Sequence, residues 1–355
     1  MKKKILVLNF GSTSTKVAVY ENTKEIIMKS IQHPQEKLRE FSHVMDQKEF
    51  RREEIMEYLE KHNYKFEDFD CVISRGGNCR PIPSGIYEIS EKMLADIVSG
   101  KYGVHPTGLG CSIAHEIGKK YEIPAITANP PIVDEFDNIA RFSGIKEIER
   151  VSSFHVLNHK AIARSYCKAF NKNYEDINLI ITHMGGGISV AAHNKGTMID
   201  ANNALDGDGP FSPERAGSLP VGDLIKMCYS GKYTLEEMLK KIRGGGGLMS
   251  YLGTSSGLEV EKMIQEGNKY AEEIYEAMAY QVSKEIGACA TVLKGEVEAI
   301  IFTGSLAYSE LFSGWVSERV KWIADIVNMA GENEMLSLAE NANLYLQGEE
   351  QLKEY

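Results

Sequence analysis

The sequence lacks paired cysteines, a positive net charge and any long apolar run. Its six cysteines are scattered and form no Cys-x-x-Cys pair, which argues against a disulfide framework or a structural zinc site and favours the reducing cytoplasm. The 50 acidic and 40 basic residues leave a formal net charge of −10, so neither nucleic acid nor an anionic membrane is expected as a partner. No segment approaches the roughly 20 apolar residues of a membrane span. The apolar run after the basic start is short, and it predicts a buried strand rather than a signal peptide.

Three familiar cofactor motifs are also missing. The sequence has no Gly-x-x-x-x-Gly-Lys-Ser/Thr loop and no Rossmann fingerprint. It has no His-Glu-x-x-His zinc pair either, since His115-Glu116 is not followed by the second histidine. A nucleotide site in this protein therefore needs another kind of loop.

Three small-residue loops supply that alternative. Each leaves an apolar run that predicts a buried strand, and their sequences are NFGSTSTK (9–16), THMGGGIS (182–189) and FTGSLAY (302–308). Backbone N–H groups without bulky side chains can approach phosphate oxygens and donate to them. Hairpin turns use the same residue types, so one such loop is weak support. Three in this order indicate nucleotide binding.

The alternation of predicted strands and helices indicates an α/β protein. A chain of 355 residues exceeds the roughly 250–300 residues of a single core, so two domains are expected. We place them at 1–150 and 151–332, with a helix in 333–355 that packs back on the first. Both contain a strand, a small-residue loop and a second strand, which suggests that the domains are half-related.

The predicted elements follow from hydrophobic periodicity and turn residues. Strands are expected at 5–8, 17–20, 71–74, 179–182, 188–193 and 299–303, and another after the turn 194–196. Helices are expected within 34–62 and at 90–99, 108–121, 156–170, 258–293, 309–327 and 334–348.

Several longer motifs resemble the acetokinase family of the actin-like sugar-kinase superfamily, and its butyrate kinases above all. The matching stretches are NFGSTSTK (9–16), SRGG (74–77), SFHVLNHKAIAR (153–164), HMGGGIS (183–189), NNALDGDGPFSPERAG (202–217), AMAYQVSKEIG (277–287), VLKGEV (292–297) and IIFTG (300–304). The resemblance runs from about residue 4 to the end and thins after residue 328. It implies two actin-like (ribonuclease-H-like) domains, with mixed sheets flanked by helices, that face a cleft between them.

The resemblance implies reversible, direct in-line transfer of a phosphoryl group from ATP to butyrate, which yields butyryl phosphate and ADP. A fatty-acid carboxylate is already ionised at pH 7, because its pKa is roughly that of a Glu side chain. The reaction therefore needs no general base, but it needs cations and hydrogen-bond donors around the phosphoryl group. Acetate, propionate or a branched acid is the nearest alternative substrate. A non-catalytic actin-like regulator and a phosphatase of the same superfamily are more distant alternatives.

The family motifs carry candidate site residues onto this sequence. The catalytic candidates are Arg75, His155, Arg215 and His105. The phosphate- and nucleotide-binding candidates are Asn9, Ser12, Ser14, Lys16, His183, Gly185, Gly186, Gly187, Thr303, Gly304 and Ser305, although His183 could equally serve packing. The pocket for the acid is assigned to Gly77, Val104, Phe154 and Pro213, and Mg²⁺ to Asp134, Asp206 and Asp208.

A few positions depart from the family pattern. Pro220 precedes Gly222-Asp223 where acetate kinases have an arginine, so Arg215 is given that role. Asn129 stands where butyrate kinases have aspartate, Tyr308 where acetate kinases have glutamate, and Ser305 where a glycine is usual. The expected cofactors remain ATP/ADP and Mg²⁺, and a homodimer or higher homo-oligomer is expected.

Overall fold

The computed structural model describes residues 2–205 and 207–355. Backbone contacts divide the chain into two compact units. Unit 1 contains the residues up to Asp134 together with Asn333–Tyr355, and unit 2 is Glu135–Glu332. The division near the middle of the chain therefore lies at Asp134/Glu135, where the sequence analysis placed it near residue 150. The expected cleft between the units stays a prediction.

Unit 1 is built on a mixed sheet with strand order β12-β5-β6-β4-β1-β2-β3 among the described residues. The strands are β1 (Lys4–Phe10), β2 (Ser14–Glu21), β3 (Lys24–Gln32), β4 (Cys71–Ser74), β5 (Ile86–Glu88), β6 (Ala125–Ala128) and β12 (Leu352–Lys353). β1 pairs antiparallel with β2 and parallel with β4. Six consecutive residues of β1 are buried, as expected of a central strand covered on both faces.

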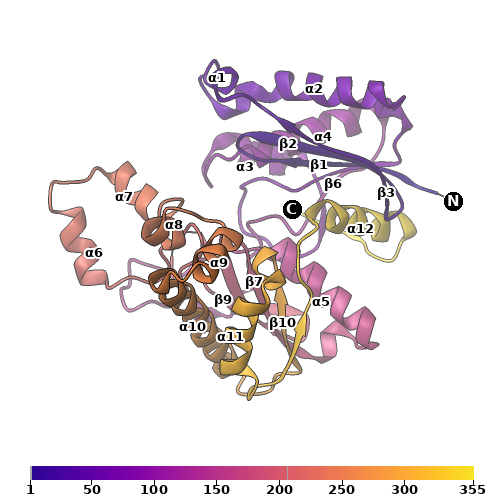
Figure 1. The fold of residues 1–355 in the computed structure, drawn as a ribbon. Helices are drawn as coiled ribbons and strands as arrows, with labels where there is room; N and C mark the ends of the chain where they lie inside the picture. The colour runs from indigo at the N-terminus through magenta and orange to yellow at the C-terminus, as the bar shows by residue number, and fades with distance from the viewer. Residues whose placement is uncertain (1, 206) are drawn as a thin grey trace. The chain divides into compact units, whose positions relative to one another are not determined.

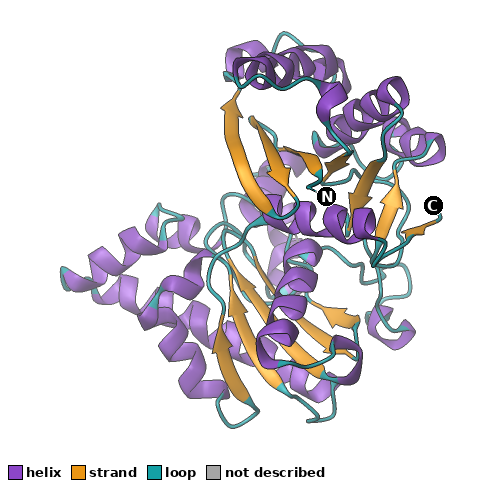
Figure 2. Cartoon of the chain, turned by 90° about the vertical axis from the view of Figure 1, so that its right-hand side faces the viewer, coloured by secondary structure: helices purple, strands orange, loops and turns teal. Residues whose placement is uncertain are grey.

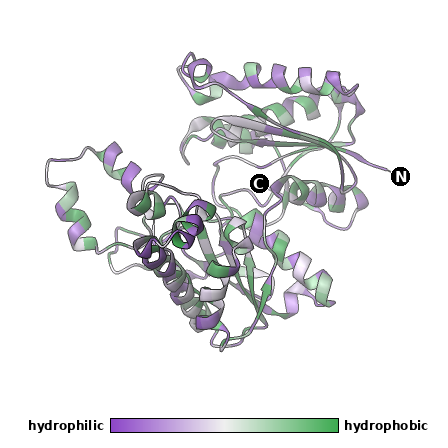
Figure 3. Ribbon diagram, in the orientation of Figure 1, coloured by the Kyte–Doolittle hydropathy of each residue, from purple (hydrophilic) through white to green (hydrophobic). Residues whose placement is uncertain are grey.

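Helices cover both faces of this sheet. They are α1 (Gln35–Leu38), α2 (Lys48–Lys61), α3 (Glu91–Ser99), α4 (Thr107–Tyr121) and α12 (Glu334–Gln347). Figure 1 shows α2 and α4 on one side of β1 and β2 and α12 on the other, and both α4 and α12 contact β1, β4 and β6. Along α2, Arg51, Ile55, Tyr58 and Leu59 are buried and the other charged residues are half-buried or exposed, and Figure 3 shows the mixed colours of this helix.

Unit 2 repeats the central topology of unit 1. Its sheet has the order β11-β10-β7-β8-β9, with β7 (Asn178–Met184), β8 (Ile188–Asn194), β9 (Thr197–Ala201), β10 (Ala299–Thr303) and β11 (Asp325–Asn328). β7 pairs antiparallel with β8 and parallel with β10, as β1 pairs with β2 and β4. The predicted half-related domains are thus confirmed in their strand topology, and Figure 2 shows the two sets of strands.

Both faces of the unit 2 sheet are buried. Ile180 and Phe302 pack in one core cluster with α10 (Lys269–Val292) and α11 (Glu310–Val320). Leu179 and Ile301 point to the other face and pack with α5 (Val156–Phe170). Alternate residues of each strand therefore serve different cores. The remaining helices are α6 (Val221–Cys228), α7 (Leu235–Ile242), α8 (Gly247–Leu252) and α9 (Gly257–Gln265).

Two helix predictions were wrong in extent. The segment 258–293 is not one helix, because α9 ends at Gln265 and α10 begins at Lys269. Gly267 between them has φ +90°, and the Asn268 side chain accepts from the N–H of Ala271 to cap α10. The helix expected at 309–327 ends at Val320 and is followed by β11. The helices expected at 90–99, 108–121, 156–170 and 334–348 are confirmed to within one residue.

None of the helices in the described ranges combines the length and apolar content that a bilayer crossing requires.

Candidate active site of the two units

The first small-residue loop of unit 1 joins β1 to β2. The Gly11 N–H donates to the carbonyl of Ser14 at 2.8 Å, which closes a tight hairpin turn. Ser12 and Lys16 are exposed and Ser14 is half-buried, whereas Asn9 is buried at the end of β1. The hydroxyl and ammonium groups of this loop are thus open to a ligand, as the sequence analysis expects of a phosphate loop.

Arg51 of α2, which the sequence analysis missed, hydrogen-bonds to the backbone of this loop from the protein interior. Its side chain is completely buried, and Nη1 donates to the carbonyls of Gly11 at 2.9 Å and Ser14 at 3.2 Å. Nη2 donates to the carbonyl of Ser12 at 3.0 Å, and Gln47 anchors both Nε and Nη2. Because these carbonyls point inward to the guanidinium, the loop is stabilised in one conformation. Burial lowers the pKa of Arg51 to about 10.

Arg75 follows β4 and lies beside the carboxylate of Glu334. Its Nη2 is 2.8 Å from Glu334 Oε1, and the Asn9 amide donates to the other carboxylate oxygen at 2.7 Å. The buried Nε of Arg75 has no hydrogen-bond partner among the described residues. Glu334 is the first residue of α12 and was not a predicted site residue. Its carboxylate contacts two predicted site residues, Asn9 and Arg75, and Asn9 lies 325 positions earlier in the sequence.

His105, just before α4, and Gly77, shortly after β4, also belong to unit 1. His105 Nδ1 is 3.1 Å from the Thr107 hydroxyl, and burial, aided by the charge of Arg75, lowers the pKa of His105. A Cβ at Gly77 would lie 2.9 Å from Gly108 Cα and 3.0 Å from Ile97 Cδ1. The space that a valine would fill at Gly77 is therefore taken by helices α3 and α4, which favours a packing role for this glycine.

The other residues assigned to the acid pocket are divided among both units. Val104, in unit 1, is 59% exposed. Phe154, in unit 2, is buried against the rings of Phe136 and His159. Pro213 lines the larger cavity of unit 2 described below. Their assignment to one acid pocket stays a prediction.

Two histidine rings stack at the end of β7 in unit 2. His155 directly precedes α5, and its ring lies 3.9 Å from that of His183, centroid to centroid. His155 Nδ1 is 2.9 Å from the hydroxyl of Ser189 on β8. His183 Nδ1 is 2.9 Å from Asn158 Oδ1, and its Nε2 is 3.4 Å from the Glu332 carboxylate. Both histidines therefore have defined polar partners.

The second and third small-residue loops lie together in unit 2. A Cβ on Gly304, which has φ +86°, would lie 2.5 Å from the carbonyl oxygen of Met184, so only glycine fits there. A cavity of about 1140 Å³ opens beside both loops. Its lining contains Gly185, Gly186, Ser305 and Tyr308 from the predicted loops, and Ser255, Ser256, Gly257, Glu261 and Tyr275, which were not predicted. This volume suits a nucleotide-sized ligand.

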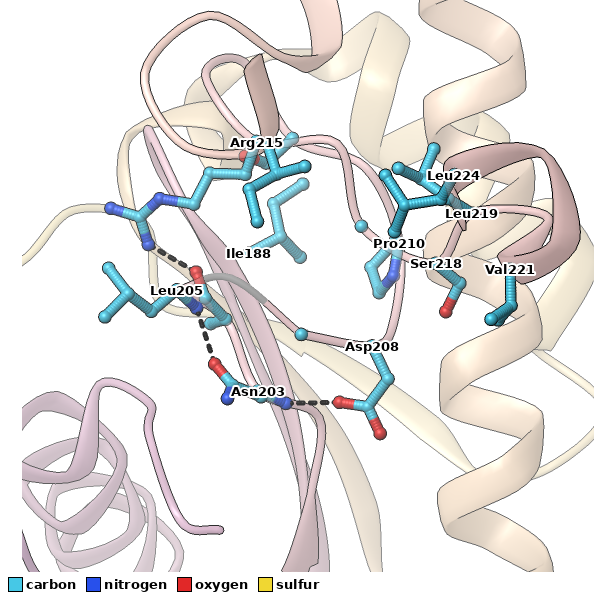
Figure 4. Close-up of a pocket in the computed structure, with 15 residues that line it drawn as sticks. Ile188, Asn203, Leu205, Asp208, Pro210, Arg215, Ser218, Leu219, Val221 and Leu224 are labelled. Carbon is cyan, nitrogen blue, oxygen red and sulfur yellow. Dashed lines mark hydrogen bonds between the residues drawn. The ribbon is translucent and has the colours of Figure 1, made fainter. Parts of the chain in front are cut away.

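Arg215 lines a second, smaller cavity of unit 2, of about 280 Å³ (Figure 4). Its Nη1 donates to the carbonyl of Ala204, and it packs against Gly187, where a Cβ would lie 2.5 Å from Nη1. Asp208 lies on the same cavity, where its carboxylate accepts from the N–H of Asn203 at 2.6 Å and from Arg150 Nε at 3.1 Å. Arg215 thus touches the glycine loop, while Asp208 supports the local backbone.

The assignment of Asp134, Asp206 and Asp208 to Mg²⁺ stays a prediction. Asp134 belongs to unit 1 and Asp208 to unit 2, and Asp206 lies outside the described residues. Within the described ranges no three His, Cys, Asp or Glu side chains form a metal-binding group. The carboxylate nearest to a predicted phosphate-loop residue, Asn9, is that of Glu334.

Comparison with known proteins fits this architecture. The sequence model of the acetokinase family matches residues 144–319. Butyrate kinase 2 of Clostridium acetobutylicum is 47% identical over 355 residues, which is 100% of both chains. The chain belongs to the acetokinase family. Butyrate kinase 1 of the same organism is 48% identical over 352 residues, 99% of each chain.

Solved structures of an acetate kinase and a propionate kinase share this fold. The acetate kinase of Porphyromonas gingivalis matches with a TM-score of 0.76 at 17% identity, over 96% of this chain and 99% of that one. A propionate kinase from Francisella tularensis matches with a TM-score of 0.73 at 18% identity, over 96% and 98%. The expectation of an α/β fold with two mixed sheets flanked by helices is therefore confirmed.

Asn129, which departs from the acetokinase pattern, has a structural role of its own. Its φ is +44°, a conformation that asparagine tolerates better than most residues. Its Oδ1 accepts from the Gly85 N–H at 2.9 Å, and its own N–H donates to the Gly85 carbonyl at 3.0 Å. The uncharged side chain of Asn129 thus hydrogen-bonds the end of β6 to the segment before β5.

Proposed function

We propose that this protein transfers the γ-phosphoryl group of ATP to the carboxylate of butyrate, and catalyses the reverse reaction from butyryl phosphate and ADP. The observation that carries the proposal is the identity of 47–48% over essentially the full length to two butyrate kinases. Acetate, propionate and branched short acids are the competing substrates. A homo-oligomeric state and a cytoplasmic location, both inferred from the sequence, stay predictions.

The side chains of unit 1 suit the binding of two anions. We assign the substrate carboxylate and the transferring phosphoryl group to Arg75, whose planar guanidinium can donate two parallel hydrogen bonds. The carboxylate of Glu334 orients that guanidinium at 2.8 Å and the Asn9 amide at 2.7 Å. Such fixed donors need not reorganise when charge moves in the transition state, which is where they stabilise it most.

The side chains of unit 2 suit the nucleotide and the phosphoryl oxygens. The 1140 Å³ cavity beside Gly185, Gly186 and Ser305 is assigned to the nucleoside part of ATP. His155 is assigned as a donor to an equatorial phosphoryl oxygen, and Arg215 as a further cation beside the glycine loop. No acid–base pair is required, because the carboxylate nucleophile is already ionised.

We assign Mg²⁺ to a site formed by a protein carboxylate together with the substrate phosphates. Mg²⁺ usually takes one or two protein carboxylates and completes its shell with phosphate oxygens and water. Glu334, beside Asn9 of the phosphate loop, offers one such carboxylate. The ion would supply positive charge that neutralises the phosphates.

Hydroxamate formation tests the proposal directly. Purified protein is mixed with ATP, MgCl₂, hydroxylamine and one acid from a panel of acetate, propionate, butyrate and isobutyrate. Acyl hydroxamate should form with butyrate at the highest kcat/KM, should need ATP, and should nearly vanish in Arg75→Ala. Higher kcat/KM on another acid of the panel would replace butyrate, and no hydroxamate with any acid would refute the kinase assignment.

A further inference from the structure

A row of hydrogen-bonded side chains, here called the histidine network, runs from His155 into the interior of unit 2. His155 Nδ1 lies 2.9 Å from Ser189 Oγ, and His159 Nε2 lies 2.9 Å from the same hydroxyl. His159 Nδ1 is 3.2 Å from His193 Nε2. His193 Nδ1 is 2.6 Å from the hydroxyl of Tyr174. Four consecutive contacts of hydrogen-bond length thus link five side chains.

The four-residue spacings within α5 and β8 place the members of each pair on the same side of their element. His155 and His159 are one turn apart at the start of α5, so they lie on one side of that helix. Ser189 and His193 are four residues apart on β8, so they lie on one face of that strand. Tyr174, the first residue of the short 3₁₀ helix Tyr174–Asp176, is the innermost member of the network.

The interior members of the network are buried and electrically neutral. Ser189, His159 and His193 are 0% exposed, and Tyr174 is 7% exposed. Burial lowers the pKa of His159 and of His193 well below the usual value, and it raises the pKa of Tyr174. Each interior histidine therefore carries one ring proton, so one ring nitrogen donates and the other accepts.

Tyr174 sets the direction of donation. In the described part of the chain its hydroxyl has a single hydrogen-bond partner, His193 Nδ1. If the hydroxyl donates there, His193 Nε2 carries the ring proton and donates to His159 Nδ1. The opposite direction would leave a buried hydroxyl proton without an acceptor, which is unfavourable.

The same order continues to the outer end. His159 then carries its proton on Nε2 and donates to Ser189. The Ser189 hydroxyl in turn donates to His155 Nδ1, so the ring proton of neutral His155 lies on Nε2.

We propose that Tyr174, His193, His159 and Ser189 are positioning residues which hold His155 as a neutral ring with Nε2–H as its donor. The proposal rests on the proposed function, in which that donor stabilises the phosphoryl group. Reversing the network would turn Nε2 into an acceptor, which cannot donate to an anionic phosphoryl group. The network therefore keeps His155 in its useful tautomer before the substrates bind.

Nuclear magnetic resonance tests the tautomer without reference to activity. Protein with ¹⁵N-labelled histidine is compared as wild type, Tyr174→Phe and Tyr166→Phe, the last a matched control because Tyr166 is a buried tyrosine of the same core cluster. Long-range ¹H–¹⁵N spectra distinguish protonated from unprotonated ring nitrogens. We expect Nε2–H on His155, His159 and His193 in the wild type and in the control, and a mixture of tautomers at His155 in Tyr174→Phe. A wild-type His155 with its proton on Nδ1 would overturn the proposal.

Kinetics test whether the tautomer matters for phosphoryl transfer. Tyr174→Phe should lower kcat roughly 3- to 10-fold, less than the roughly 10²–10³-fold loss expected when the donor itself is removed in His155→Ala. The KM values for ATP and for the acid should stay within about two-fold. Ser189→Ala should fall between these two variants, and Tyr166→Phe should match the wild type.

A double-mutant cycle separates positioning from general stability. Because Tyr174 acts through His155, the double variant His155→Ala/Tyr174→Phe should have the kcat of His155→Ala alone. If the two losses multiply, or if Tyr174→Phe keeps the wild-type kcat, the positioning role is refuted. A wild type without kinase activity would instead refute the proposed function, while the tautomer spectra would still decide the direction of the network.

Discussion

Arg51 provides a quantitative test of how the predicted phosphate loop is stabilised. Its guanidinium binds the carbonyls of Gly11, Ser12 and Ser14 from two nitrogens, and Gln47 anchors it from behind. In Arg51→Lys a single ammonium replaces this fork, so at least two hydrogen bonds to a charged group are lost. Each is worth about 1.5–3 kcal/mol, which predicts a loss of about 3 kcal/mol or more. For a unit of this size the Tm should fall by roughly 6–12 °C.

The loop should also bind phosphate less well, because its N–H groups are no longer held in one conformation. We expect KM for ATP to rise about ten-fold, equivalent to about 1.4 kcal/mol, while KM for the acid changes less than two-fold. Both constants are measured well below the Tm of the variant. The matched control is Arg52→Lys, since Arg52 is exposed on the same helix and pairs with Glu49 at the surface. If the Tm falls but KM for ATP does not change, Arg51 stabilises the fold without shaping the phosphate site.

The remaining predictions concern catalysis, packing and acid stability. Arg75→Ala should lose roughly 10²–10³-fold in kcat and Arg75→Lys should recover little, whereas near-normal turnover would reassign Arg75 to structure. Gly77→Val should lower the Tm, because its Cβ would lie 2.9 Å from Gly108 Cα. It should also reduce kcat/KM for acetate and for butyrate equally. A loss of kcat/KM confined to butyrate would restore the acid-pocket assignment. Burial, aided by Arg51, lowers the pKa of His33 to about 4 although the Glu54 carboxylate lies 2.8 Å away. A histidine in the unfolded chain titrates near pH 6.5. The stability that neutral His33 contributes to the fold is therefore complete above about pH 6.5 and is lost as the pH falls toward 4. Free energies of unfolding from urea titrations should fall between pH 7 and pH 5 by roughly 1–2 kcal/mol more in the wild type than in His33→Gln, and an equal fall in both proteins would contradict the assignment.

The sequence alone was sufficient for the elements whose signal is local. Apolar runs such as Ile5–Leu8 and Ala299–Thr303 became central strands, because a segment apolar on both faces can be accommodated only where both faces are covered. The small-residue loops were also recognisable, since close backbone approach at Gly304 tolerates no Cβ. The break at Gly267 was missed because the apolar spacing continues across it, and only the backbone conformation shows where α10 begins.

The partners of the site residues were decided by the tertiary structure. Glu334 meets Asn9 across 325 positions only because α12 packs against β1. Arg51 reaches the predicted phosphate loop because α2 covers the same sheet, and nothing in its local sequence marks it as buried. In the sequence, His155 and His159 are four residues apart, and so are Ser189 and His193. Their alignment, however, depends on how α5 crosses β8. Hydrophobic periodicity encodes which side of an element is buried, whereas the polar groups that meet there are set by strand register and helix packing.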